Sequence, residues 1–277
     1  MSRILIENVN ALLDEGELRL VAGVDIAVEG RRIVAVDSAP DGFVPDEVLD
    51  GRGLLALPGL FNAHCHAAMS LQRGWAEDLP FDRWLNERVW VAESALKEPD
   101  IYWGAALAAC EMIRSGVVGF ADHYFWMDQV GRVVQESGLK ALLAWCHFGL
   151  PPDQEVGGAT LETCTAFTQR WHGQADGRVR AAMGPHSPYM CAPEVLRAMA
   201  EAADALGVGL HLHLAESEEQ LRVSLDKHGA SPVRHLHDLG LLERPLLAAH
   251  CLVLAPGDLE LLALPNVSVA HTPKTYM

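Results

Sequence analysis

From about Pro58 onward, apolar strand-like runs alternate with amphipathic helical segments. Strand–helix alternation of this kind predicts βαβ units and a parallel sheet. No GxGxxG turn follows any of the runs, which disfavours an open dinucleotide-binding sheet. We therefore predict an α/β fold, a (β/α)8 TIM-type barrel with about seven of its strands present. The seven runs are GLFNAHCH, GVVGFADHYF, KALLAWCHF, VRAAMGPHSP, GVGLHLHLAE, LLAAHCLVL and NVSVAHTP.

The residues before Pro58 have a different pattern. Short stretches rich in aliphatic and β-branched residues, such as ILIENVNALL and LVAGVDIAVEG, are punctuated there by Gly and Asp. This pattern predicts short strands joined by turns. We therefore expect two parts, an all-β segment over 1–57 and the barrel over 58–277.

The charge and cysteine content exclude several classes of protein. The net charge is −16 with a pI of about 5.1, so the chain would repel nucleic acid and anionic membranes. No apolar stretch is long enough to span a bilayer, and the N-terminus lacks the apolar core of a secretory signal. The six cysteines are scattered without a CxxC pair, which predicts free thiols in a cytoplasmic protein.

Histidines recur in or at the ends of the strand-like runs. In a parallel barrel the C-terminal strand ends meet at one mouth, where active sites form. Residues i and i+2 of a strand point to the same side, so His64 and His66 can reach one ion. Neutral imidazole suits Zn²⁺ and similar divalent metals. An isolated HxH pair can equally be two polar residues satisfied by the backbone, and the recurrence favours the metal site.

A second cluster lies in HLHLAESEE. His211 and His213 share a face, and Glu216 follows where the strand gives way to a helix. A site that activates water needs a nearby carboxylate to carry the proton, and Glu216 is the candidate. His250 follows an apolar strand and suits a third ligand or a hydrogen-bond donor to the attacking water. His186, before a Pro-bounded loop, suits substrate contact.

The chain resembles the amidohydrolase superfamily, and within it the aminohydrolases that deaminate methylthioadenosine and S-adenosylhomocysteine. The segments that carry the resemblance follow one another in the family's order and with its spacing. They are LPGLFNAHCHAAMSLQRGWAEDLPFDRWL, GPHSPYMCAPEVL, HLHLAESEEQ, LLAAHCLVL and VSVAHTPKT.

The resemblance implies a role for each matching residue. His64, His66 and His213 would bind one divalent metal, expected to be zinc although iron, manganese and nickel also accept three imidazoles. Glu216 would shuttle a proton between the attacking water and the substrate ring nitrogen, and His250 would stabilise the developing charge.

The remaining implied roles concern the substrate and the surrounding fold. Glu93 and His186 would contact the substrate, Glu93 through ribose hydroxyls, and residues 1–57 would form part of a small β-sandwich. The segment QRGWAEDLPFDRWL, with Trp75 as a substrate contact, forms either a lid over the pocket or an amphipathic helix packed on the barrel. The partners implied are a small-molecule substrate and further copies in a homo-oligomer.

One element of the family pattern has no counterpart here. The family places a metal-binding aspartate after an eighth strand, whereas the last aspartate of this sequence is Asp258, before the seventh run. We therefore expect the chain to be incomplete at its C-terminus. Two other interpretations remain open: the same chemistry on guanine, 8-oxoguanine, pterin, cytosine or s-triazine rings, and a non-catalytic metal or nucleoside binder.

Overall fold

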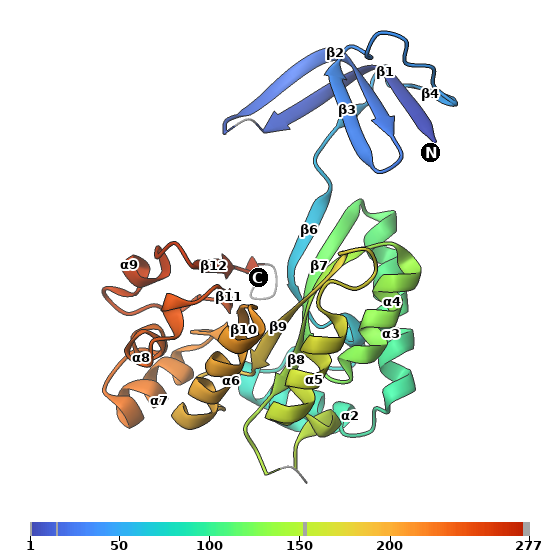
Figure 1. Cartoon of the computed structure of the whole chain (residues 1–277). Coiled ribbons are helices and arrows are strands. Elements are labelled where there is room, and N and C mark those ends of the chain that lie inside the picture. Colours follow the sequence, from blue (N-terminus) through green and yellow to red (C-terminus); the bar gives the residue numbers. More distant parts are fainter. Residues whose placement is uncertain (1, 15, 152–153, 274–277) are drawn as a thin grey trace. The chain divides into compact units, whose positions relative to one another are not determined.

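The computed structural model describes residues 2–14, 16–151 and 154–273, and the chain divides into two compact units, Met1–Leu60 and Phe61–Met277. In Figure 1 the first unit carries the dark-blue strands and the second carries all the helices. No helix in the described part of the chain is long and apolar enough to cross a membrane.

The first unit is a small five-stranded sheet. Its order is β3-β2-β1-β4, and β5 also pairs with β1. β1 and β2 are antiparallel, and their inward-facing side chains, including Val9 and Val24, form a separate small core. The short strands expected in this region are present, and β4 is an additional one. The strands are β1 (Arg3–Asp14), β2 (Leu18–Glu29), β3 (Arg32–Asp37), β4 (Glu47–Asp50) and β5 (Leu55–Ala56).

The second unit contains a seven-stranded sheet in the order β12-β11-β10-β9-β8-β7-β6. The pairs from β7 to β12 are all parallel. Sheet order follows chain order, as expected for consecutive right-handed βα units. All seven strands fall within the runs predicted from the sequence. They are β6 (Leu60–Cys65), β7 (Val117–Tyr124), β8 (Lys140–His147), β9 (Val179–Pro185), β10 (Leu210–Leu214), β11 (Leu246–His250) and β12 (Val267–Ala270).

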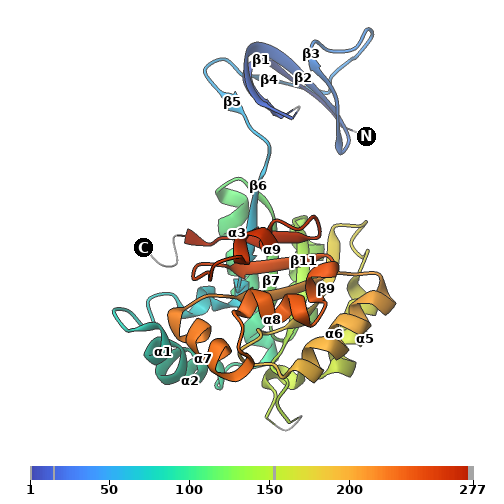
Figure 2. The same ribbon diagram turned by 90° about the vertical axis from the view of Figure 1, so that its left-hand side faces the viewer.

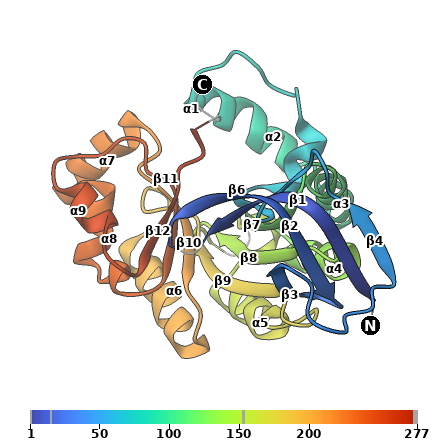
Figure 3. The same ribbon diagram turned by 90° about the horizontal axis from the view of Figure 1, so that it is seen from above.

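Helices connect these strands and cover the outer side of the sheet (Figures 2 and 3). Ser217 begins α7 by accepting a hydrogen bond from the Gln220 N–H, and Gly207 and Gly229 end α6 and α7 in the left-handed conformation. The helices α3 to α9 are α3 (Glu98–Arg114), α4 (Met127–Ser137), α5 (Leu161–Trp171), α6 (Pro193–Leu206), α7 (Glu218–His228), α8 (Pro232–Asp238) and α9 (Asp258–Leu262). The other helical segments are η1 (Ala67–Gln72), α1 (Phe81–Trp84), η2 (Leu85–Val89), α2 (Trp90–Glu93), η3 (Val156–Gly158) and η4 (Leu241–Glu243).

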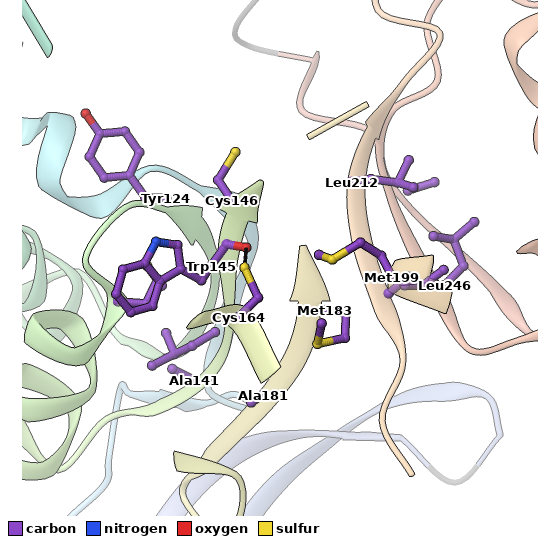
Figure 4. Close-up of a cluster of buried hydrophobic side chains, with 14 of the residues drawn as sticks. Tyr124, Ala141, Trp145, Cys146, Cys164, Ala181, Met183, Met199, Leu212 and Leu246 are labelled. Carbon is purple, nitrogen blue, oxygen red and sulfur yellow. Dashed lines mark hydrogen bonds between the residues drawn. The ribbon is translucent and has the colours of Figure 1, made fainter. Parts of the chain in front are cut away.

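The main core lies between the sheet and this helical layer. Figure 4 shows Met183 and Leu212 from the strands near Met199 of α6, all fully buried. The Cys164 thiol of α5 donates to the Trp145 carbonyl of β8 at 3.5 Å. Each such apolar side chain contributes roughly 1.5–3 kcal/mol by leaving water. This packing holds the strand ends rigidly enough to support a site.

The segment after β6 is held by close backbone contact with α3. A Cβ atom at Gly104 would lie 2.3 Å from the Ala68 carbonyl oxygen of η1, so only glycine allows this approach. Since η1 begins directly after His66, α3 indirectly positions the end of β6.

Candidate metal centre and active-site cavity

Three histidines from different strands meet at the C-terminal end of the barrel sheet. Ring nitrogens of His64, His213 and His250 all lie within 4.8 Å of one another. His64 is on β6 and His250 on β11, with four strands between them in the sheet order, yet their ring centroids are 5.2 Å apart. The sheet must therefore curve around a common centre. The predicted barrel is confirmed by this geometry and by the parallel strand order.

His66 joins the group through His213, and backbone contacts determine how both rings are protonated. His66 Nδ1 lies 2.6 Å from the His123 carbonyl oxygen, and His213 Nδ1 lies 2.9 Å from the His186 carbonyl oxygen. Because a carbonyl only accepts, both Nδ1 atoms carry hydrogen and both Nε2 atoms carry lone pairs.

These two Nε2 atoms face each other at 3.3 Å. Two lone pairs at this distance repel one another unless a cation lies between them. Tetrahedral zinc bonded to two nitrogens at about 2.05 Å would hold them about 3.3–3.4 Å apart. The donor set of His66 and His213 therefore fits a divalent metal.

His64 completes the donor set. Its Nε2 is buried without a hydrogen-bond partner in the described part of the chain, while its Nδ1 lies 2.9 Å from His211 Nε2. Burial lowers the pKa of His64, His66 and His213, so these imidazoles are neutral at pH 7. Neutral imidazole is the form that binds metal.

Glu216 and His250 form a polar pair beside this cluster. The Glu216 Oε1 atom lies 3.4 Å from His250 Nε2. Gln220 holds Glu216 twice, since its amide donates to Oε2 at 3.3 Å and its amide oxygen accepts the Glu216 N–H at 3.0 Å. His250 Nδ1 lies 3.0 Å from the Thr272 hydroxyl, and burial lowers the His250 pKa to about 3.

The backbone at these two strand ends is strained. Ala215 has φ = 51°, and the consecutive residues His250 and Cys251 have φ values of 79° and 51°. Non-glycine residues in this left-handed region cost on the order of 1 kcal/mol or more each and cluster at functional sites. Backbone hydrogen bonds from the Cys251 N–H to the Leu214 carbonyl and from the Leu252 N–H to the Ala215 carbonyl join the two strand ends.

A cavity of about 590 Å³ opens above the cluster. Its inner end is polar, with the histidines and Glu216. Its outer wall is largely apolar and aromatic and comes mainly from the segment after η1 and from the ends of β7 and β8. That wall includes Met69, Leu79, Phe81, Trp84, Leu85, Val89, Trp90, Phe125 and Phe148. The cavity suits a flat polar ring bearing a less polar substituent.

Glu93 and His186 both line this cavity. The Tyr124 hydroxyl donates to Glu93 Oε1 at 2.6 Å, and burial, only partly offset by this hydrogen bond, raises the Glu93 pKa to about 7. His186 stacks on Phe148 with ring centroids 4.5 Å apart, and burial lowers its pKa to about 3. The second oxygen of Glu93 can accept hydrogen bonds from ligand hydroxyls.

Trp75 lies apart from these residues. Its side chain is 58% exposed, and it lines a smaller cavity of about 230 Å³ together with Trp84. Trp84 of α1 also lines the main cavity, together with Phe81 of the same helix. The substrate contact of Trp75 stays a prediction.

Sequence reasoning missed several residues of the site. Tyr124 follows a predicted strand-end histidine, Gln220 lies one helical turn after Glu216, and Thr272 lies in the last matching segment. These positions close to predicted site residues could have marked them as candidates, but the sequence spacing does not reveal which residues they contact. His211 was placed on the face of His213 without a role.

Comparison with known proteins agrees with this geometry. The sequence profile of the amidohydrolase family matches residues 55–277. The chain belongs to the amidohydrolase family. A 5-methylthioadenosine/S-adenosylhomocysteine deaminase of Pelotomaculum thermopropionicum is 40% identical over 280 residues, covering 100% of this chain and 64% of that protein. The corresponding deaminase of Desulforudis audaxviator is 44% identical over 256 residues, covering 91% of this chain and 59% of that protein.

Solved structures of this amidohydrolase fold superpose closely. An adenosine deaminase from Xanthomonas campestris with bound zinc has a TM-score of 0.91 at 28% identity, covering 99% of this chain and 63% of that one. An atrazine chlorohydrolase from Arthrobacter aurescens complexed with zinc has a TM-score of 0.84 at 25% identity, covering 97% and 65%. The chain thus spans about two thirds of the length of these proteins or slightly less. Together with the histidine cluster, these neighbours support a divalent metal.

Proposed function

We propose that the protein is a metal-dependent aminohydrolase that deaminates an amino-substituted purine nucleoside such as methylthioadenosine, S-adenosylhomocysteine or adenosine. The observation that carries the proposal is Glu216, held against His250 at the edge of a histidine cluster and facing a cavity of nucleoside size. The names of the similar deaminases support the same chemistry.

His64, His66 and His213 are the proposed metal ligands, and zinc is the proposed ion. A bound divalent ion would lower the pKa of water toward neutrality and so supply the nucleophile. The fit rests on the two opposed Nε2 lone pairs and on the buried, unpartnered Nε2 of His64.

Glu216 is the proposed proton carrier. It takes the proton of the attacking water and delivers it to the ring nitrogen next to the amino-bearing carbon. A C–O bond forms at that carbon, the C–N bond to the amino group breaks, and the group leaves as ammonia after receiving a second proton through Glu216. Gln220 keeps the carboxylate directed at this position.

His250 is the proposed stabiliser of the developing charge. The Thr272 hydroxyl can donate to Nδ1, which leaves the hydrogen on Nε2, the atom that faces Glu216. This Nε2–H can donate to the oxygen that becomes negative in the transition state.

Glu93, His186 and Trp75 are the proposed substrate contacts. Glu93 would accept hydrogen bonds from ribose hydroxyls with Oε2, because Tyr124 donates to Oε1. His186 would contact the ring from the cavity wall. Trp75 would contact the substrate only at the edge of the site, since it lines the neighbouring cavity.

The wider setting also belongs to the proposal. We assign residues 1–57 to part of a β-sandwich and residues 58–277 to the catalytic barrel. We also propose that the protein acts on a small-molecule substrate, has no nucleic-acid or membrane partner, is located in the cytoplasm and assembles into a homo-oligomer. The acidic charge supports the absence of nucleic-acid and anionic-membrane partners, and the scattered cysteines support the cytoplasmic location.

The test is ammonia release from a panel of nucleosides by the zinc-loaded full-length protein, with Glu216→Gln beside it. We expect turnover of a purine nucleoside, and a 10²–10⁴-fold loss in the variant at unchanged zinc content. Glu218→Gln, an exposed carboxylate in the first turn of α7, is the matched control and should be fully active.

Other outcomes would redirect the assignment. Near-normal turnover by Glu216→Gln would refute its role. Turnover of guanine, 8-oxoguanine, pterin, cytosine or an s-triazine alone would replace the substrate class. Tight nucleoside binding without any turnover would identify a binder instead of an enzyme.

A further inference from the structure

A second, fully buried imidazole lies directly behind the proposed metal ligand His64. His211 is 0% exposed, and its Nε2 lies 2.9 Å from His64 Nδ1. Its ring centroid is 5.1 Å from that of His64, with the two planes nearly perpendicular. His211 comes from β10 and His64 from β6, so this contact crosses the interior of the barrel.

The protonation of the pair follows from the metal site. If His64 presents the lone pair of Nε2 to the ion, its hydrogen must be on Nδ1. His211 must then accept that hydrogen with Nε2 and carry its own on Nδ1. The short distance between the two nitrogens fits this donor–acceptor assignment.

His64 differs from the other two ligands in this respect. Metal-bound histidines usually donate their second N–H to a carboxylate, a carbonyl or water, which orients the ring. His66 and His213 use backbone carbonyls, whereas His64 has the side chain of His211. The orientation of His64 alone therefore depends on a residue that substitution can remove.

His123 is another buried imidazole beside His211, with ring centroids 5.2 Å apart. Its Nε2 lies 3.2 Å from the Gly184 carbonyl, so Nε2 donates and Nδ1 carries a lone pair. A Cβ atom at Gly184 would come within 3.0 Å of the His123 ring, so glycine is needed for this close packing. In this assignment Nδ1 of His211 is a donor and Nδ1 of His123 is an acceptor. Neither atom has a hydrogen-bond partner in the described residues.

We infer that His211 is a positioning residue that accepts the Nδ1–H of His64 and thereby directs the Nε2 lone pair of His64 at the metal. The inference rests on the metal site of the proposed function and adds to it a determinant of affinity outside the ligand set. His211 does not touch the ion or the substrate.

The test compares zinc affinity in His211→Leu and His211→Gln, measured by competition with a chromophoric chelator. Leucine removes the acceptor, and we expect a 10–100-fold loss of affinity, as for other partners of metal ligands. The glutamine amide oxygen reaches about as far as Nε2 and can accept the same hydrogen, so the affinity should stay within about threefold. His235→Leu, which removes another largely buried imidazole on α8, is the matched control and should bind zinc normally.

A measurement without variants gives a second readout. Ring-nitrogen NMR of the zinc-loaded protein should show His64 with hydrogen on Nδ1, coupled to His211 Nε2. A different tautomer, or wild-type affinity in His211→Leu, would overturn the role of His211 while leaving the metal site intact. A wild-type protein that binds no zinc would overturn the proposed metal site and this role with it.

Discussion

Replacing Gly104 by alanine should loosen the contact between α3 and η1, the segment that follows β6. The added Cβ would lie 2.3 Å from the Ala68 carbonyl oxygen and 2.9 Å from its Cα, whereas ordinary contacts are 3.4–4 Å. Since both atoms belong to the backbone, no side-chain rotation relieves the clash. The helix and η1 must separate by about 1 Å.

Two effects of opposite sign determine the size of the change. Overpacking of this kind costs about 1–3 kcal/mol. Alanine is intrinsically better than glycine inside a helix by about 1 kcal/mol. Because the clash is with backbone atoms, the overpacking penalty should be near its upper limit, so the net loss in the free energy of unfolding is about 1–2 kcal/mol. For a unit of this size that lowers Tm by roughly 2–8 °C.

The assay is thermal unfolding with chelator present, followed by zinc titration of the folded protein. Leu107→Ala, on the exposed face of the same helix, is the control and should change stability by less than about 0.5 kcal/mol. Because η1 begins after His66, zinc affinity should fall in Gly104→Ala as well. A Tm equal to or above wild type would refute the reasoning, since helix propensity alone predicts that result.

Three further predictions concern the site. Burial raises the Glu93 pKa from 4.5 to about 7, so the folded state keeps this proton to higher pH than the unfolded state. The stability contributed by the bound proton is complete below pH 4.5 and is lost as the pH rises through 7, and the loss is on the order of 3 kcal/mol. In chelator, wild type should therefore lose this much more stability than Glu93→Gln between pH 4 and 8 in urea unfolding, and parallel profiles would contradict the assignment. Gln220→Met removes both contacts to Glu216 and should lower kcat about tenfold at nearly constant KM in the ammonia assay. Gln129→Met, on the surface, is the control. An unchanged kcat would show that Glu216 does not need Gln220 to hold its orientation. Chelating the metal should lower Tm in calorimetry, since free zinc at 100 times its Kd adds about 2.7 kcal/mol, and an unaffected Tm would argue against a metal bound to the folded state.

Local rules were sufficient for the barrel strands and for the direction of their histidines. Each strand is a short, mostly apolar run between turn signals, so its existence does not depend on distant residues. The period-two rule placed His64 and His66 on one side of β6, and their ring centroids lie 5.0 Å apart. By contrast, β4 has four exposed residues, two of them acidic, and pairs only because β1 lies beside it.

Contacts between elements could not be predicted in the same way. The pair of His64 and His211 depends on the curvature of the sheet, which brings β6 and β10 together across the barrel. The Tyr124 contact with Glu93 depends on where α2 returns to the sheet. Trp75 lines the smaller cavity, whereas Phe81 and Trp84 line the main one; the turns before α1 determine this arrangement, and the residue spacing does not show it.

The left-handed residues at the ends of β10 and β11 set a limit on engineering this protein. Glycine at 215 or 251 would relieve backbone strain and could raise the melting temperature. The same change would make the backbone next to Glu216 and His250 more flexible than it is with Ala215 and Cys251. We expect thermostability and turnover to conflict at these two positions, whereas cavity-filling substitutions in the core behind the sheet should raise thermostability without loss of turnover.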